Sequence, residues 1–410
     1  MPAKNRVQQF DVPSRKGYDA IFDASYLEDI PAQLQTWKSK RVLLVVSKAL
    51  DSNTPIAQDL EKTLGDLVVD RKAGVGSHSP YADVIDIAHR IQDQQADCVI
   101  SLGSSSYSDA CKIARLLAES MPAGFGAGDM EGLVDEEEGA APQDALGRPE
   151  MVRLILVPTS LSASEWNSVS SCTNEGGKKQ HFGSWEHGAP DLILLDPRVA
   201  STSPERLWLS SGVRAVDHCV EIMCNDRSWE DDVKEVHVHT EKGLRCLLKG
   251  LKGYKEGKER GNEGELLGGI SECQYGAREA IMGLVVHRVP LGPSHAIGHQ
   301  LGSVAGVLHG ETSCVMLAPV LRQTRDRSSR AQAKVLDIFN ETLGWQEKEA
   351  SDAVRRFVKM LSLPTSLSEV GVTTDEQVKK VAEKAVNDVW GGGKRQMEYE
   401  EILETLNLVR

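Results

Sequence analysis

The sequence predicts an α/β unit followed by an all-helical unit, with the boundary near residue 200. In the first half, short apolar runs typical of buried parallel strands alternate with helical patterns. Beyond Pro204 no run resembles a strand, and helical periodicity dominates. A chain of 410 residues is also long enough for two domains. We therefore expect domains 1–200 and 201–410, with a ligand-binding cleft where they meet.

The expected strands are short, and each is followed by a helical pattern or a turn. They cover 41–46, 66–70, 97–102, 152–157 and 192–195, with helices at 26–38, 53–64, 81–94 and 110–120. In the second half we expect helices at 205–224, 230–250, 263–287, 294–305, 311–322, 329–343, 347–362, 375–389 and 397–408. Residues 121–150 are rich in glycine, proline and acidic side chains, which predicts a mobile lid or an unstructured spacer.

Composition narrows the class of protein. The net charge of -13 argues against nucleic-acid or anionic membrane partners, because their phosphates would be repelled. The eight cysteines form no Cys-x-x-Cys pair, and several lie in apolar runs, as free thiols do in a reducing compartment. No signal peptide or apolar run of membrane-spanning length is evident. We expect a cytoplasmic protein that acts on a small molecule.

Two small-residue turns follow expected strands. The first holds Gly103, which permits a tight turn, and then a serine run before a helix whose N-terminus favours a diphosphate. Its candidate cofactor-binding residues are Gly103, Ser104, Ser105, Ser106 and Asp109. The second turn contributes Thr159, Ser160, Leu161 and Ser164. Either could be a plain turn, but two at one sheet edge favour nucleotide binding.

Three histidines gather in the second half. His295 and His299 are four residues apart and share one face of a helix, and His309 follows a glycine-rich stretch. Imidazoles brought together in this way suit a metal site or a proton relay. Surface or hydrogen-bonded core histidines are the alternative.

Four motifs, in order, resemble those of the iron-containing (group III) alcohol dehydrogenases, a family that includes the maleylacetate reductases. They are Gly103-Ser-Ser-Ser-x-x-Asp-x-x-Lys112, Pro158-Thr-Ser-Leu-Ser-Ala-Ser-Glu165, Gly212-Val-Arg-Ala-Val-Asp-His-Cys-Val-Glu221 and His295-Ala-x-x-His-Gln-Leu-Gly302. The resemblance implies a dehydroquinate synthase-like architecture, with an N-terminal dinucleotide-binding domain. It also implies NAD(P)-dependent hydride transfer to or from a carbonyl carbon of a small organic substrate.

The resemblance also assigns roles to single residues. It implies metal ligands at His218, His295 and His309, and a proton relay near the nicotinamide at His299. Lys178 corresponds to a lysine near the cofactor phosphates, although a solvated hairpin is the alternative.

One position departs from the family pattern. Arg214 stands where the family has an aspartate metal ligand, and a guanidinium beside a divalent cation would be repelled. We therefore expect a site for iron or zinc that is lost or weakened. Arg214 would then polarise the substrate carbonyl or bind a substrate carboxylate, so that Arg214, His218 and His299 form the expected catalytic set. An ion pair of Arg214 with Asp217 or Glu221 is the alternative.

A second departure concerns the cofactor. Ser47 closes the first strand where many members carry an acidic residue, so repulsion of a 2′-phosphate is absent and NADPH should serve at least as well as NADH. Two rival functions stay open: maleylacetate reductase-like reduction of an acidic enone, and a dehydroquinate synthase-like lyase. A homodimer is compatible with the sequence.

Overall fold

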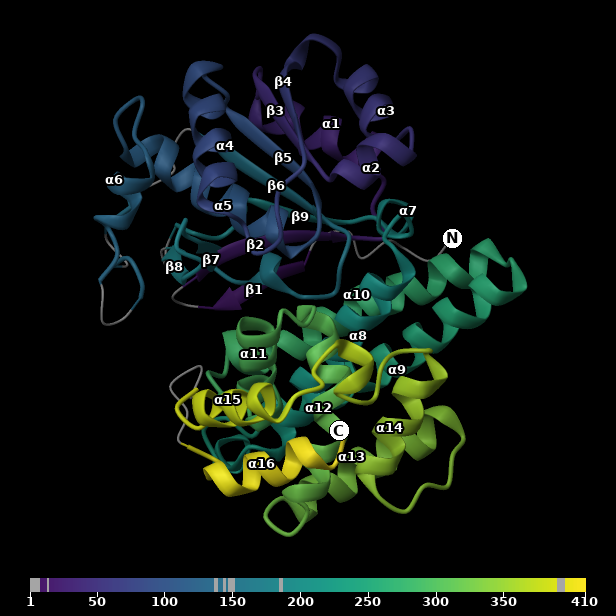
Figure 1. The fold of residues 1–410 in the computed structure, drawn as a ribbon. Helices are drawn as coiled ribbons and strands as arrows, with labels where there is room; N and C mark the ends of the chain where they lie inside the picture. The colour runs from purple at the N-terminus through teal and green to yellow at the C-terminus, as the bar shows by residue number, and fades with distance from the viewer. Residues whose placement is uncertain are drawn as a thin grey trace. The chain divides into compact units, whose positions relative to one another are not determined.

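The computed structural model describes residues 8–12, 15–135, 139–142, 145–146, 152–183, 187–388 and 395–410. The chain divides into two compact units, Met1–Ser203 and Pro204–Arg410. Figure 1 shows an α/β unit in the first and helices in the second, as the sequence predicts.

The first unit is built on a seven-stranded sheet of order β1-β2-β9-β6-β5-β3-β4 (Figure 1). The strands are β1 (Gln8–Val12), β2 (Arg15–Phe22), β3 (Val42–Val46), β4 (Val68–Ala73), β5 (Cys98–Gly103), β6 (Arg153–Pro158) and β9 (Leu192–Leu195). Only β1 and β2 pair antiparallel within the described sheet. The five expected strands are present. Strands β1 and β2 were not predicted, because their polar residues hide the apolar pattern.

Helices cover both faces of this sheet. They are α1 (Tyr26–Trp37), α2 (Lys48–Asn53), α3 (Ile56–Leu64), α4 (Tyr81–Asp93), α5 (Ser105–Ser120), α6 (Ala127–Glu131) and α7 (Pro197–Ala200). Alternate residues of β3 enter opposite cores: Leu43 and Val45 pack with α4 and α5, whereas Leu44 packs with α1 and α3. The continuous apolar runs of the central strands follow from this burial on two sides.

The segment 121–150 is in part a folded element, which corrects the expectation of a lid or spacer. Phe125, just before α6, and Met130, on α6, are buried in the same core as residues of α4 and α5. The acidic run at 136–138 lies outside the described residues. Two further unpredicted strands, β7 (Val169–Thr173) and β8 (Lys179–Gly183), form a separate antiparallel hairpin.

The second unit contains helices and no strand among its described residues. The helices are α8 (Glu205–Cys224), α9 (Val236–Arg260), α10 (Glu263–Val285), α11 (Pro293–Ala305), α12 (His309–Gln323), α13 (Ser329–Leu343), α14 (Ala350–Met360), α15 (Asp375–Ala385) and α16 (Tyr399–Asn407). Each corresponds to an expected helix, although α15 ends before the expected 389, which lies outside the described residues. None of the described helices is long and apolar enough to cross a membrane.

Candidate active site

The ends of β3, β5 and β6 meet at one edge of the sheet. Ser47 follows β3 and donates its backbone N–H to Leu102 of β5 (2.8 Å), while Thr159 donates to Gly103 (2.9 Å). A Cβ at Gly103 would lie 2.5 Å from the Tyr107 ring, so only glycine fits this turn. The two small-residue turns are therefore neighbours, as expected from parallel strands.

Lys112 joins these two turns. It is almost fully buried, and its Nζ donates to Ser164 O (2.6 Å) and Asn167 O (2.9 Å) and lies 3.2 Å from Asp109 Oδ1. Two of the three ammonium donors are therefore satisfied by carbonyls, and the Asp109 carboxylate balances the charge as an ion-pair partner. Burial lowers the pKa of Lys112, and the Asp109 carboxylate opposes that shift.

The predicted cofactor-binding residues lie around this edge, with one exception. Ser104 is the N-cap of α5, Ser105 begins the helix, and Ser106 Oγ accepts the N–H of His78 (3.2 Å). Ser160 and Leu161 are buried, and no described residue bonds the Ser160 hydroxyl. A helix start with unpaired N–H groups, an unpartnered hydroxyl and a glycine turn fit a dinucleotide phosphate. Lys178, by contrast, lies exposed in the turn between β7 and β8.

In the helical unit, four histidines from three helices form a row. The ring centroids of His218 on α8 and His295 on α11 are 4.8 Å apart and stacked. His295 and His299 follow at 6.4 Å, and His299 stacks on His309 of α12 at 6.1 Å. The structure thus brings together all the histidines that the sequence singled out.

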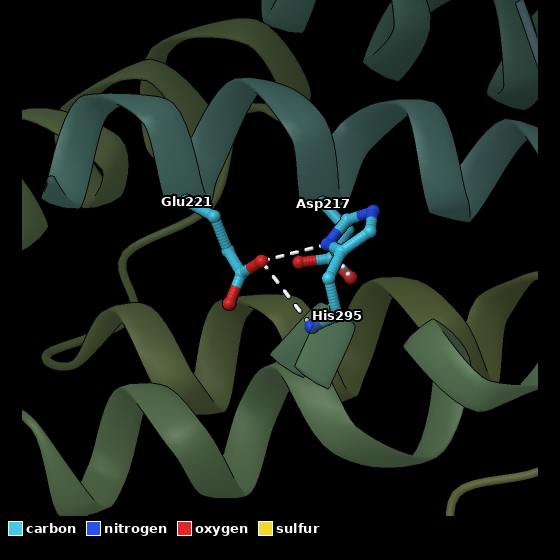
Figure 2. A group of neighbouring side chains, drawn as sticks. All are labelled: Asp217, Glu221 and His295. Carbon is cyan, nitrogen blue, oxygen red and sulfur yellow. Dashed lines mark hydrogen bonds and ion pairs between the residues drawn. The ribbon is translucent and has the colours of Figure 1, made fainter. Parts of the chain in front are cut away.

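Two buried carboxylates contact His295, the second histidine of this row. Figure 2 shows Asp217 and Glu221 on one helix, with His295 facing them. His295 Nδ1 and Glu221 Oε2 share a hydrogen bond of 2.6 Å, and the Nε2 atom of His295 is buried and without a partner among the described residues. Glu221 also accepts the backbone N–H groups of Gly292 (2.9 Å) and Ser294 (2.6 Å) at the start of α11. Its function here is to cap that helix and orient the imidazole.

Burial shifts the pKa of the two carboxylates and of the histidines His218 and His295 beside them. Desolvation raises the pKa of Asp217 to about 6, and burial together with the Asp217 charge raises the pKa of Glu221 well above its usual range. Burial and the positive charge of Arg214 lower the pKa of His218 to about 3. The imidazoles of His218 and His295 are therefore neutral at physiological pH.

Arg214 is buried within the same cluster. Its Nη1 donates to Thr312 Oγ1 (3.2 Å) and Ser313 Oγ (3.3 Å) and reaches His309 O at 3.5 Å. Among the described residues, no carboxylate lies within ion-pair distance, so the expected alternative of an intrahelical pair with Asp217 or Glu221 is not found. Desolvation lowers the pKa of Arg214 to about 10, which still leaves it charged at neutral pH. Its remaining N–H donors are available for a ligand.

Sequence reasoning missed several residues of this cluster. Asp388, beyond α15, has Oδ2 at 3.2 Å from His299 Nδ1 and accepts Gln300 Nε2 (2.8 Å). Thr312 and Ser313, which hold Arg214, were not predicted either. Their only signal was proximity to His309, and nothing in the sequence pointed to Asp388.

The metal ligands implied by the resemblance are not arranged around one point. Within the described residues, the one group of three ligand atoms within 4.8 Å is Asp217, Glu221 and His295. In that group Glu221 already accepts from backbone and imidazole, whereas Asp217 Oδ1 and His295 Nε2 have no hydrogen-bond partner among the described residues. Arg214 stands in place of the family aspartate, and its positive charge would repel a divalent ion placed beside it.

Comparison with known proteins agrees with the architecture. Residues 18–197 match the description "Iron-containing alcohol dehydrogenase", and residues 209–409 match "Fe-containing alcohol dehydrogenase family, C-terminal". Dehydrogenase ALT3 of Alternaria alternata is 30% identical over 85% of this chain and 93% of its own length. Dehydrogenase FUM7 of Gibberella moniliformis is 29% identical over 86% of each chain. Sulfoacetaldehyde reductase of Bifidobacterium kashiwanohense, solved with NAD+, has a TM-score of 0.77 at 17% identity and covers 95% of this chain and 96% of its own.

The chain therefore belongs to the iron-containing alcohol dehydrogenase family, and it is an oxidoreductase. The predicted family and fold class are confirmed. The fold of the maleylacetate reductase of Agrobacterium tumefaciens is also similar, with a TM-score of 0.74 at 19% identity over 98% of this chain and 97% of its own.

Proposed function

We propose that this protein uses NAD(P)H to reduce a carbonyl or enone carbon of a small organic substrate, or oxidises the corresponding alcohol, at the cluster of Arg214 and four histidines. The observation that carries this proposal is the state of Arg214. It is buried, charged and fixed through Nη1 alone, so its other donors can meet an oxygen of the substrate.

The α/β unit would bind the cofactor. The glycine turn at Gly103, the start of α5 and the unpartnered Ser160 hydroxyl support a diphosphate at this edge. When bound, the dihydronicotinamide supplies a hydride. Ser47 keeps its backbone position by capping α2 through Leu50 N (3.1 Å). We do not assign Lys178 a phosphate contact, since its exposed turn favours the solvated-hairpin alternative.

The chemistry then falls to this chain's own residues. As hydride reaches the carbonyl carbon, negative charge develops on the oxygen, and the guanidinium of Arg214 stabilises it. His299, in its imidazolium form, delivers the proton to that oxygen from Nε2 and is left neutral. Asp388 accepts from Nδ1 and so fixes which nitrogen faces the substrate. His218 and His295, both neutral, line the site without competing for the negative charge.

We further propose that no divalent ion is needed, because Arg214 supplies the positive charge that a metal supplies elsewhere in the family. Two measurements on protein purified without added metal test this. Elemental analysis should find iron and zinc well below one per chain, and EDTA should leave NADPH-dependent turnover unchanged. Stoichiometric metal, with activity lost on chelation and regained on adding it back, would contradict the proposal.

The cofactor claim has its own test. Replacing Ser47→Asp keeps a good helix cap while adding a negative charge beside the expected ribose. The variant should lose roughly tenfold in kcat/KM for NADPH and little for NADH. An equal loss with both cofactors would show that Ser47 does not face the ribose.

A substrate that carries a carboxylate is the second candidate, and Arg214 favours it as well. Guanidinium groups bind carboxylates through paired hydrogen bonds, and the donors left by Nη1 allow this. Comparing an aldehyde with its carboxylated analogue separates the two roles. If Arg214→Lys raises KM only for the acidic substrate, then Arg214 binds the carboxylate and does not meet the developing oxyanion.

A further inference from the structure

A pocket opens on the surface of the helical unit, and it is not lined by the four histidines of the row. It has a volume of about 30 Å³, opens into solvent, and lies between α12, α14 and the last residues of the chain. Its lining residues are Cys314, Val315, Ala318, Pro319, Arg322, Ser351, Asp352, Arg355, Thr365, Leu408 and Val409. None of them belongs to the cluster of Arg214 and the four histidines.

Two arginines converge on this pocket without partners. Among the described residues, neither Arg322 on α12 nor Arg355 on α14 makes an ion pair or a side-chain hydrogen bond. Their neighbours do: Arg325 pairs with Glu349 (2.7 Å), and Arg356 pairs with Glu347 (2.7 Å). The chain has 60 acidic residues and 47 basic ones, so acidic partners are abundant. Two unpaired guanidiniums at one pocket therefore indicate a site for an anion.

The rest of the pocket defines the kind of anion. Ser351 and Thr365 add hydroxyl groups, whereas Val315, Pro319 and Leu408 form an apolar wall. Asp352 is the one carboxylate among the lining residues, which leaves a net positive charge beside the two arginines. We propose that this pocket binds a small organic anion, whose carboxylate or phosphate group pairs with Arg322 and Arg355 and whose short apolar body packs on that wall.

The pocket shares a helix with the active-site cluster. Thr312 and Ser313 of α12 hold Arg214, and the next residues, Cys314 and Val315, line the pocket. The proposal does not depend on the proposed function, because binding is measured without turnover.

Titration calorimetry with the full chain tests the site, with hexanoate and inorganic phosphate as probes. We expect at least one probe to bind with a Kd at or below about 1 mM, and the Arg322→Ala/Arg355→Ala double variant to weaken it at least tenfold. The matched control is Arg325→Ala/Arg356→Ala, which removes two paired arginines from the same helical region and should bind as the wild type does. Circular dichroism of both variants checks that each is folded.

The two probes separate the sources of the anion. Binding of hexanoate alone indicates a carboxylate with an apolar body, and binding of phosphate alone indicates a phosphate monoester. The proposal is overturned if neither probe binds at a concentration of about 10 mM, or if the folded double variant binds the probe as tightly as the wild type does. It is also overturned if light scattering shows a dimer that the double variant loses, because the pocket would then be a contact between copies of this chain.

Discussion

Each unit of this protein contains a buried cation, and the two are held differently. Lys112 in the α/β unit donates to the carbonyls of Ser164 and Asn167 and forms an ion pair with the Asp109 carboxylate. Arg214 in the helical unit makes its contacts through Nη1 alone, to two hydroxyls and one carbonyl. Both side chains are almost fully buried, and burial lowers the pKa of both.

The difference separates a structural charge from a functional one. A buried cation that is hydrogen-bonded and ion-paired within the protein contributes to stability and has little left to offer a ligand. A buried cation with spare donors costs stability, and it is retained where a negative charge arrives during function. Lys112 should therefore matter for folding, and Arg214 for turnover.

Replacing Arg214→Met should have the largest effect. The charge that meets the developing oxyanion is lost, so kcat should fall by about 10²–10³-fold, as for removal of an oxyanion donor. Initial rates with NADPH and an aldehyde measure this. The folding midpoint in urea should stay the same or rise, because a desolvated charge has been removed. If the variant keeps the kcat of the wild type, Arg214 has a structural role, as Lys112 does, and does not act in turnover.

Replacing His299→Ala should lower kcat by about 10²-fold, the usual loss of a general acid. The affinity for NADPH should change little, since the expected cofactor phosphates lie with the other unit's turns. Stopped-flow turnover and fluorescence titration of NADPH separate the two quantities. His287→Ala is a suitable control, because this histidine is also partly buried but lies outside the row. Unchanged turnover would remove His299 from the mechanism.

Replacing Lys112→Met tests the other side of the comparison. Two carbonyls and the Asp109 carboxylate lose their partner, so the free energy of unfolding should fall by about 3 kcal/mol. Urea unfolding at pH 7 measures it. A residual kcat within a few-fold of wild type, in protein kept folded at low temperature, would agree with a structural role. If Lys112→Met lowers kcat as much as Arg214→Met does, the two cations do not differ in role.

Replacing Glu165, which interacts with Lys112, should have the smallest effect, and that effect on the free energy of unfolding should depend on pH. Burial raises the pKa of this carboxyl to about 7, from an ordinary 4.5 in the unfolded chain. The folded state therefore binds the proton more tightly, and this contribution to stability is full below pH 4.5 and is lost as the pH rises through 7. Glutamine does not ionise, so the Glu165→Gln variant keeps this contribution at every pH. Its free energy of unfolding, relative to that of the wild type, should therefore rise by about 2 kcal/mol between pH 5 and pH 8. If urea unfolding gives the same stability difference between variant and wild type at pH 5 and at pH 8, Glu165 is not a buried, neutral carboxyl group.

The α/β unit was largely predictable because its signals are local. Continuous apolar runs and the turns that follow them define β3, β5 and β6, and parallel strands bring their ends to one edge. The exceptions are β1, β2 and the β7–β8 hairpin, whose strands are rich in polar residues and depend on neighbours for their pairing. The burial of Phe125 and Met130 was hidden by a composition typical of loops.

By itself the sequence determined the order of the units, the helices and the substitution at Arg214, because periodicity and motif spacing are properties of adjacent residues. Only the tertiary structure decided what Arg214 bonds and which carboxylate faces His299. Thr312 is 98 residues from Arg214, and Asp388 is 89 residues from His299. Such contacts arise from helix packing, which no spacing along the chain encodes.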